Sequence, residues 1–196
     1  SNCAYRREPL IVCVGFRNGA LSEDSDLTVT FCRAGYRVRF MEDAISYQQV
    51  PQSLDGYLKQ HIRWGRGLND VARVHSLDLL HDHTLHLALR LELLLFTAGY
   101  LDRLALMSAV LLVGASYLLG NTLITLLWII LFSLAMPLVQ IVVLFCKERM
   151  NIAMWLRLPL VPVFFLLDIF AAIRSMLDTL LNQPRLWTKT QREEIP

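Results

Sequence analysis

The sequence predicts a chain of two parts, a mixed α/β domain followed by helices that lie on or cross a membrane. Hydrophobic residues make up 55% of the 196 residues, more than an ordinary soluble domain contains. Most charged residues fall within positions 1–103, whereas positions 104–146 contain no Asp, Glu, Lys or Arg. Short strand-like and helix-like segments alternate in the charged part.

Composition excludes two classes of function. The formal net charge of +2 is too small for a nucleic-acid-binding domain, and the basic residues are dispersed rather than grouped with aromatic residues. The cysteines show no CxxC spacing, so neither a zinc site nor a disulfide framework is expected from Cys3, Cys13, Cys32 and Cys146.

The first fifty residues are predicted to alternate short elements. The segment NCAY near the start is strand-like, a short helix is expected near residues 7–12, and residues 15–19 form a turn region. Two further short strands are expected around residues 38–40 and 44–47. The opening residues are typical of the inside of a domain, so we expect a fragment of a larger protein.

A helix is predicted over residues 23–34, because Ser22 is a favourable N-cap and Gly35 a favourable C-cap. The cluster SEDSD places carboxylates at its start, where the helix dipole and free N–H groups keep an aspartate ionised and able to accept a proton. Acidic residues are common at helix starts, so this cluster alone is more often structural than catalytic.

A second, longer helix is predicted over residues 54–74, after Pro51 and Ser53, with Gly65 and Gly67 weakening it locally. Gln60, Arg63 and Trp64 share one face of this helix because they are three and four residues apart. A guanidinium can fork onto diphosphate oxygens and an indole can pack on a sugar ring. Alone, such a pair more often serves packing.

Residues 76–103 are predicted to form an amphipathic interfacial helix. Positions 85–100 are rich in leucine, but Arg90 and Glu92 would each cost roughly 2.5–3.5 kcal/mol at a bilayer centre. Histidines also cluster around the start of this segment without the i, i+4 spacing of helical metal ligands. We therefore expect a solvated loop leading into the helix, and not a metal site, at His75, His81, His83 and His86.

Residues 104–146 are predicted to form a transmembrane hairpin of two helices, about 104–120 and 122–146. As one helix they would extend roughly 65 Å, about twice the hydrocarbon thickness of a bilayer. Basic residues flank the hairpin on both sides, at Arg103 and Lys147, so both ends and the preceding domain should lie in the cytoplasm.

Residues 147–196 are predicted to form an interfacial or re-entrant segment with a basic cytosolic tail. The apolar run at 158–173 is interrupted by Pro159, Pro162 and Asp168, which favours this interpretation over a third span.

The order of these segments resembles a known family. SEDSDLT, then AGYRVRF, then VPQSLDGYLKQHIRW follow one another within about 45 residues. This succession is similar to the C-terminal half of the catalytic domain in processive family 2 glycosyltransferases, which include cellulose, chitin, hyaluronan and poly-N-acetylglucosamine synthases. The resemblance runs from NCAYRRE to the end, where WTKT is similar to the W-x-K-T tail of many bacterial members.

The resemblance implies a glycosyltransferase A-type α/β fold, of which this chain would be the C-terminal part. It makes Asp24 the catalytic base, with Ser22 in place of the commoner threonine, and it assigns substrate binding to Glu23, Gln60, Arg63 and Trp64. Asn2 would border the acceptor pocket, or be a strand residue without such a role.

The resemblance also implies a reaction and its partners. The enzyme would be an inverting hexosyltransferase that moves sugar from a nucleotide sugar, typically a UDP-sugar, to a growing polysaccharide at a bacterial plasma membrane, coupled to export. Mg²⁺ or Mn²⁺ would be held by an upstream aspartate motif, so the chain alone should be inactive. The alternatives are transfer of one sugar to a lipid carrier, or a non-catalytic membrane subunit.

Overall fold

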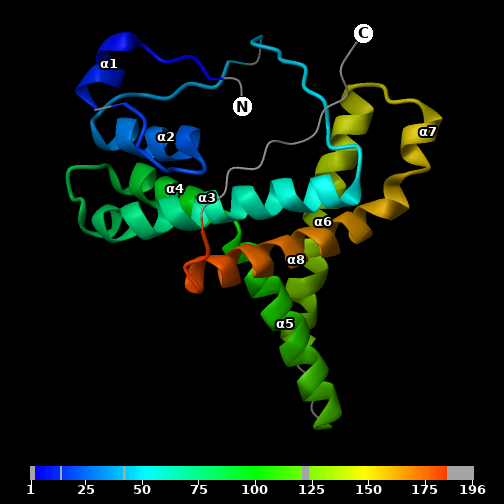
Figure 1. The fold of residues 1–196 in the computed structure, drawn as a ribbon. Helices are drawn as coiled ribbons and strands as arrows, with labels where there is room; N and C mark the ends of the chain where they lie inside the picture. The colour runs from blue at the N-terminus through cyan, green and yellow to red at the C-terminus, as the bar shows by residue number, and fades with distance from the viewer. Residues whose placement is uncertain (1–2, 14, 42, 121–123, 185–196) are drawn as a thin grey trace. The chain divides into compact units, whose positions relative to one another are not determined.

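The computed structural model describes residues 3–13, 15–41, 43–120 and 124–184. The chain divides into two compact units, residues 1–100 with 174–196, and residues 101–173. Figure 1 labels the α-helices of the described residues. The elements are α1 (Arg7–Val12), α2 (Glu23–Arg33), α3 (Leu54–His81), α4 (Leu87–Thr97), α5 (Leu101–Leu118), α6 (Ile124–Lys147), α7 (Ile152–Trp155), the 3₁₀ helix η1 (Leu158–Leu160) and α8 (Val161–Leu180).

The first unit is organised around α2, α3 and α4. Helix α2 runs beside the second half of α3 in the same direction, with Ser22 against Gly67 at one end and Arg33 paired with Asp78 at 2.9 Å at the other. Helix α4 packs on α3 after a short connection (Figure 1). The shared apolar core consists of Val29, Cys32, Val71, Leu79 and Leu93, with Leu85, Leu89 and Leu94 packed against it.

Helix α3 confirms the predicted start and extends beyond the predicted end. The Ser53 hydroxyl accepts a hydrogen bond from the Gly56 amide at 3.1 Å, which satisfies one of the free N–H groups of the first turn. The helix continues past Val74 to His81 because Val71, His75 and Leu79 recur at helical spacing and are buried.

The predicted strands do not form among the described residues. Cys3–Tyr5 of the NCAY segment and positions 38–40 and 44–47 have irregular backbone without ladder pairing. A strand is stabilised by hydrogen bonds to a neighbouring strand, and no described segment offers these residues one. Their side chains are accordingly uncovered: Phe40 is 92% exposed and Tyr47 is 95% exposed.

The predicted interfacial helix over 76–103 is wrong in its bounds. Its first residues belong to α3, α4 covers only Leu87–Thr97, and its last residues begin α5. Helix α3 ends at His81, and Asp82 is its C-cap residue. The Asp82 carboxylate accepts a hydrogen bond from the Thr84 amide at 3.1 Å, which favours a turn at this point. Helix α4 is apolar on two sides: one side carries the buried Leu93, and the other carries the exposed Leu87, Leu91 and Leu95.

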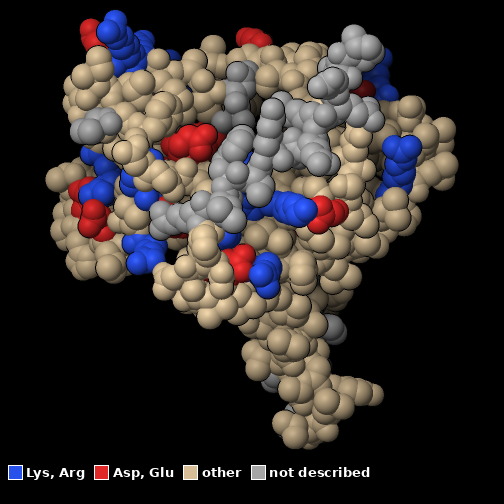
Figure 2. Space-filling view, viewed as in Figure 1, with Lys and Arg blue, Asp and Glu red and all other residues tan. Residues whose placement is uncertain are grey.

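The second unit contains the predicted hairpin, because α5 and α6 pack against each other along the chain's uncharged stretch. Gly120 adopts a φ of +75° at the end of α5, a conformation that favours glycine. On the face seen in Figure 2, no charged side chain appears on the described part of the hairpin near the connection between α5 and α6. Among the described residues, two helical stretches are long and apolar enough to cross a membrane, Leu101–Leu118 and Ile152–Leu180.

The segment predicted to be interfacial or re-entrant, residues 158–173, begins with η1 and continues as α8. Pro159 lies at the start of η1, where its missing N–H costs no helical hydrogen bond. The prolines therefore do not interrupt α8, which is longer than the sequence predicted. Its position in a membrane stays a prediction.

Candidate substrate site

Asp24 lies in the first turn of α2, with Glu23 beside it. The Asp24 carboxylate accepts a hydrogen bond from the Ser25 amide at 2.8 Å, so it meets the free N–H groups of the helix start as predicted. The predicted hydroxyl cap of Ser22 is wrong: its side chain makes no capping bond. Ser22 is instead buried against α3, and Asp24 occupies the amide at the helix end.

Tyr5 lies close to this helix start and was missed by the sequence analysis. Burial raises the pKa of the Tyr5 phenol, and the neighbouring Cys3, Asp24 and Glu23 raise it further. Its ring meets Phe16 and Phe31 edge-on, with centroids 5.9 Å apart in each pair. The phenol therefore stays protonated and neutral beside the two carboxylates.

The Q-x-x-R-W residues lie on the first half of α3. Gln60 and Arg63 are half-buried, and Trp64 is 39% exposed, so its indole can meet a ligand. His61, which the sequence analysis passed over, stacks on Tyr57 at 3.9 Å and meets Trp64 at 5.0 Å. Its Nδ1 lies 2.9 Å from the Tyr57 carbonyl, which fixes the proton on that nitrogen. Tyr57 and His61 are four residues apart on the helix, and this i, i+4 spacing is the sequence signal that could have predicted their contact.

Gly67 lets the two motifs approach each other. A Cβ at this position would overlap the Ser22 hydroxyl and lie 2.7 Å from the Ser22 Cβ. Because Arg63 precedes Gly67 by one helical turn, this contact brings the start of α2 beside the helix that carries Q-x-x-R-W. Among the described residues, no hydrogen bond or ion pair joins Asp24 to that motif. The structure places them on adjoining elements without direct contact.

Gly65 serves a second close contact of α3, with the last turns of α8. A Cβ on Gly65 would lie 2.5 Å from the Ser175 hydroxyl. Asn69, one turn further on, lies within 3.5 Å of the Ser175 and Thr179 hydroxyls. Both glycines therefore lie inside the helix as packing residues, whereas the sequence predicted only a local weakening of it.

A cluster of buried charged and polar side chains joins α2 to α3. Arg17 donates to Asp26 at 2.9 Å and to Asp70 at 2.6 Å, and His75 Nε2 lies 3.0 Å from Asp26. The prediction that His75 belongs to a solvated loop is therefore wrong. Sequence reasoning missed this cluster because Arg17 and Asp26 are far in sequence from Asp70 and His75. The four residues share no motif spacing.

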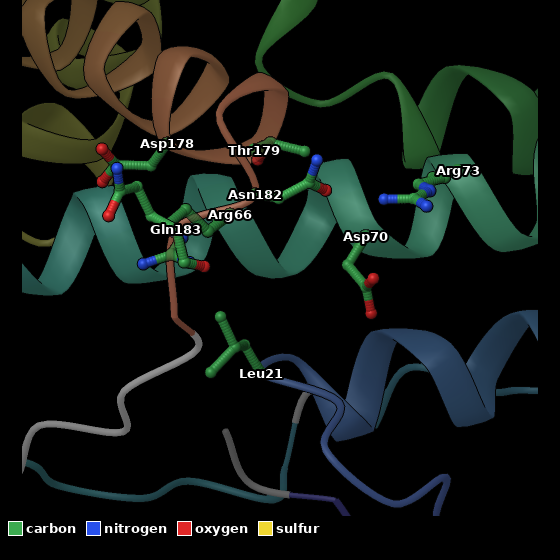
Figure 3. Close-up of a pocket in the computed structure, with 8 residues that line it drawn as sticks. All are labelled: Leu21, Arg66, Asp70, Arg73, Asp178, Thr179, Asn182 and Gln183. Carbon is green, nitrogen blue, oxygen red and sulfur yellow. The ribbon is translucent and has the colours of Figure 1, made fainter.

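A small cavity of about 80 Å³ lies beside this part of α3 (Figure 3). Two hydrogen bonds hold the chain after α8 there: Arg66 donates to the carbonyls of Gln183 and Pro184 at 2.7 and 2.9 Å. In Figure 3, Asp70 points toward the start of α2, whereas Arg66 lies against Gln183. The lining residues are Leu21, Arg66, Asp70, Arg73, Asp178, Thr179, Asn182 and Gln183.

Some predicted features cannot be placed. Asn2 and the WTKT tail, residues 187–190, lie outside the described residues. Within the described ranges, no three His, Cys, Asp or Glu side chains are arranged to hold a metal ion. The Mg²⁺ or Mn²⁺ site stays a prediction for residues outside this chain.

Comparison with known proteins identifies the family of this chain. The family described as "Glycosyl transferase family group 2" matches residues 1–181. The chain therefore belongs to this family, and the family implies a glycosyltransferase A-type fold. The match covers both the Asp24 motif and the Q-x-x-R-W motif.

Individual relatives carry related names. The chain is 27% identical to "Probable glycosyltransferase YdaM" of Bacillus subtilis (strain 168), over 98% of this chain and 48% of that protein. It is 36% identical to an "N-acetylglucosaminyltransferase" of Sinorhizobium fredii over 73 residues, which are 33% of this chain and 18% of that protein. The chain thus spans about half the length of the first relative and less of the second. No solved structure matches it significantly.

Proposed function

We propose that this chain carries the catalytic base and the diphosphate-binding helix of an inverting glycosyltransferase that extends a polysaccharide at a membrane. The observation that supports this most directly is the contact between Ser22 and Gly67. It brings the carboxylates at the start of α2 beside the helix that bears Arg63 and Trp64. An enzyme of this kind needs a base and a cation on opposite sides of one reacting carbon.

The chemistry follows from these two groups. Asp24 takes the proton from an acceptor hydroxyl, whose oxygen attacks the anomeric carbon of the donor sugar. The bond from that carbon to the nucleoside diphosphate breaks on the opposite face, so the configuration inverts. Arg63 compensates the charge that develops on the leaving diphosphate, and a planar guanidinium can bind two of its oxygens at once.

The remaining motif residues would hold the sugars. Trp64 is exposed enough for its indole face to stack on a ring of the acceptor, with its orientation fixed by His61. Gln60 is on the same face of α3 and can bond to hydroxyls. Glu23, which is exposed beside Asp24, can accept bonds from the acceptor. Asn2 remains a candidate for the acceptor pocket.

We propose N-acetylglucosamine from its UDP-activated form as the first donor to test, because several relatives are named N-acetylglucosaminyltransferase. Growth of a polymer with coupled export would explain the uncharged stretch, residues 104–146, that forms most of α5 and α6. In that arrangement the motif-bearing unit lies in the cytosol and the exposed leucines of α4 rest at the membrane surface.

The test is turnover by the full-length enzyme in membranes with Mg²⁺ and a panel of nucleotide sugars. We expect Asp24→Asn to abolish polymer formation, since the amide cannot take the proton. A matched control is Asp55→Asn, which changes an exposed carboxylate in the first turn of α3 and should retain activity. Activity that survives Asp24→Asn would refute the base assignment. A single sugar on a lipid product would indicate the lipid-carrier alternative, and no product with any donor would favour the non-catalytic one.

A further inference from the structure

Four side chains from three segments meet beneath the start of α2. Arg17 comes from the loop before α2, Asp26 from α2 itself, and Asp70 and His75 from α3. Asp26 is 4% exposed, and Asp70 and His75 are also buried. Nothing in the proposed chemistry uses them.

Asp26 lies two residues after Asp24, which places the two carboxylates roughly 200° apart around the helix. Asp26 therefore faces α3, and Asp24 faces away from the cluster. The bonds of Asp26 to Arg17 and His75 resist rotation of the first turn of α2 about its axis. Such a rotation is the movement that would displace Asp24 most.

A buried ionic cluster is a costly way to hold two helices together. Desolvation of the charges can exceed their attraction, and apolar side chains of similar volume often stabilise a fold as well or better. What directed ionic bonds add is a fixed geometry. Burial alone would lower the pKa of Arg17, but its hydrogen bonds to Asp70 and Asp26 raise it overall, so the guanidinium stays charged.

We propose that Arg17, Asp26, Asp70 and His75 are positioning residues that set the rotation of α2 and hence the place of Asp24 relative to the Q-x-x-R-W helix. This inference rests on the proposed function for its catalytic consequence. None of the four side chains acts on the substrate. They act through α2 and its contact with α3.

The test uses the full-length enzyme in membranes and three variants. Asp26→Asn keeps the side chain's shape and removes one charge. Arg17→Met leaves two buried carboxylates without their cation, so it should lower the Tm most. The triple variant Arg17→Met, Asp26→Asn, Asp70→Asn removes that conflict and should recover much of the Tm. Arg33→Met is the control, because it breaks the ion pair with Asp78 at the other end of α2.

We expect kcat to fall about 100-fold in Asp26→Asn and in the folded triple variant, since a misplacement of the catalytic group by about 1 Å can have that effect. The donor KM should change less than about threefold, because the diphosphate-binding face of α3 is intact. Amide hydrogen exchange across residues 22–33 should become faster in both variants. The Arg33→Met control should lower the Tm but retain kcat.

Wild-type kcat in the folded triple variant would overturn the inference, since the cluster would then be a matter of stability alone. An equal loss in Arg33→Met would overturn it as well. If the intact enzyme makes no product with any donor, the proposed function fails. In that case amide hydrogen exchange alone tests the role of the cluster. Unchanged exchange across residues 22–33 in Asp26→Asn would show that the cluster does not hold α2.

Discussion

At the residue scale, Asp24 and Asp26 show how one helical turn divides two tasks. Asp24 is half-buried and bonded to the amide of Ser25, whereas Asp26 is buried among Arg17 and His75. Two positions of sequence separation put them on different sides of α2. The same residue type therefore serves as candidate base in one place and as part of an ionic cluster in the other.

Arg63 is expected to act through the geometry of its guanidinium as well as its charge. In the full-length enzyme, Arg63→Ala should lower kcat by about 100-fold, because a group that stabilises developing charge is lost. Arg63→Lys should recover part of this, since an ammonium keeps the charge without the planar fork. Steady-state kinetics at varied donor concentration would measure kcat for both variants. Full activity of Arg63→Ala would contradict the diphosphate role.

Gly67→Ala is expected to separate α2 from α3. The added methyl would overlap Ser22, and relieving such overpacking typically costs about 1–3 kcal/mol. The Tm should fall, and Ser22→Gly in the same chain should restore part of it by making room. Gly114→Ala is the control, because nothing lies near a Cβ there. An unchanged Tm in Gly67→Ala would refute the close contact.

At the element scale, α3 connects the features of the first unit. Its first half bears the Q-x-x-R-W face, its middle meets Ser22 and Ser175 through two glycines, and its last turns hold the core with α2 and α4. One continuous helix can keep these contacts in register because its axis is stiff. A break near Gly65 would have uncoupled them.

The end of α3 is expected to be sensitive to acid. The hydroxyl of Thr84 bonds to Asp82 and lowers the pKa of that carboxyl, and Arg33 lowers it further. A lowered pKa in the folded state means a contribution to stability that is present above the ordinary pKa, about 3.9, and lost as the pH falls below it. The Tm difference between wild type and Asp82→Asn should therefore be larger at about pH 6 than at about pH 3. A difference independent of pH would contradict this assignment.

At the scale of the whole molecule, charged residues are distributed unevenly along the chain. The first unit carries the motifs and the ionic cluster, and the second contains residues 104–146, which include no Asp, Glu, Lys or Arg. The connection at Tyr100 is short, so α5 begins directly after the motif-bearing unit.

The orientation of the hairpin is open to a labelling test. If α5 and α6 cross the bilayer, their outer ends share one side and their turn lies on the other. In a chain whose other cysteines are replaced by serine, Cys146, which is exposed at the end of α6, should react with an impermeant maleimide from the cytoplasmic side. In a second such chain, where Cys146 is also replaced by serine, a cysteine introduced by Leu119→Cys should react from the opposite side. Reaction of both from the same side would show that the hairpin does not cross.

The sequence by itself determined several of the helices and the helical face that the motif residues share. Local signals were enough for α1, for the starts of α2 and α3, and for the hairpin, because caps, periodicity and uncharged length are properties of neighbouring residues. The face shared by Gln60, Arg63 and Trp64 likewise follows from helical spacing alone. Strands were predicted at positions where the described residues form none, because local β-propensity does not supply a partner strand.

Only the tertiary structure decided which distant residues meet. Gly65 and Gly67 were expected to weaken α3, and the fold uses their missing Cβ atoms for contacts with Ser175 and Ser22. His75 was assigned to a solvated loop, and the fold buries it against Asp26. Close approach and buried ion pairs depend on how elements pack, and elements separated by tens of residues leave no periodic trace of that packing in the sequence.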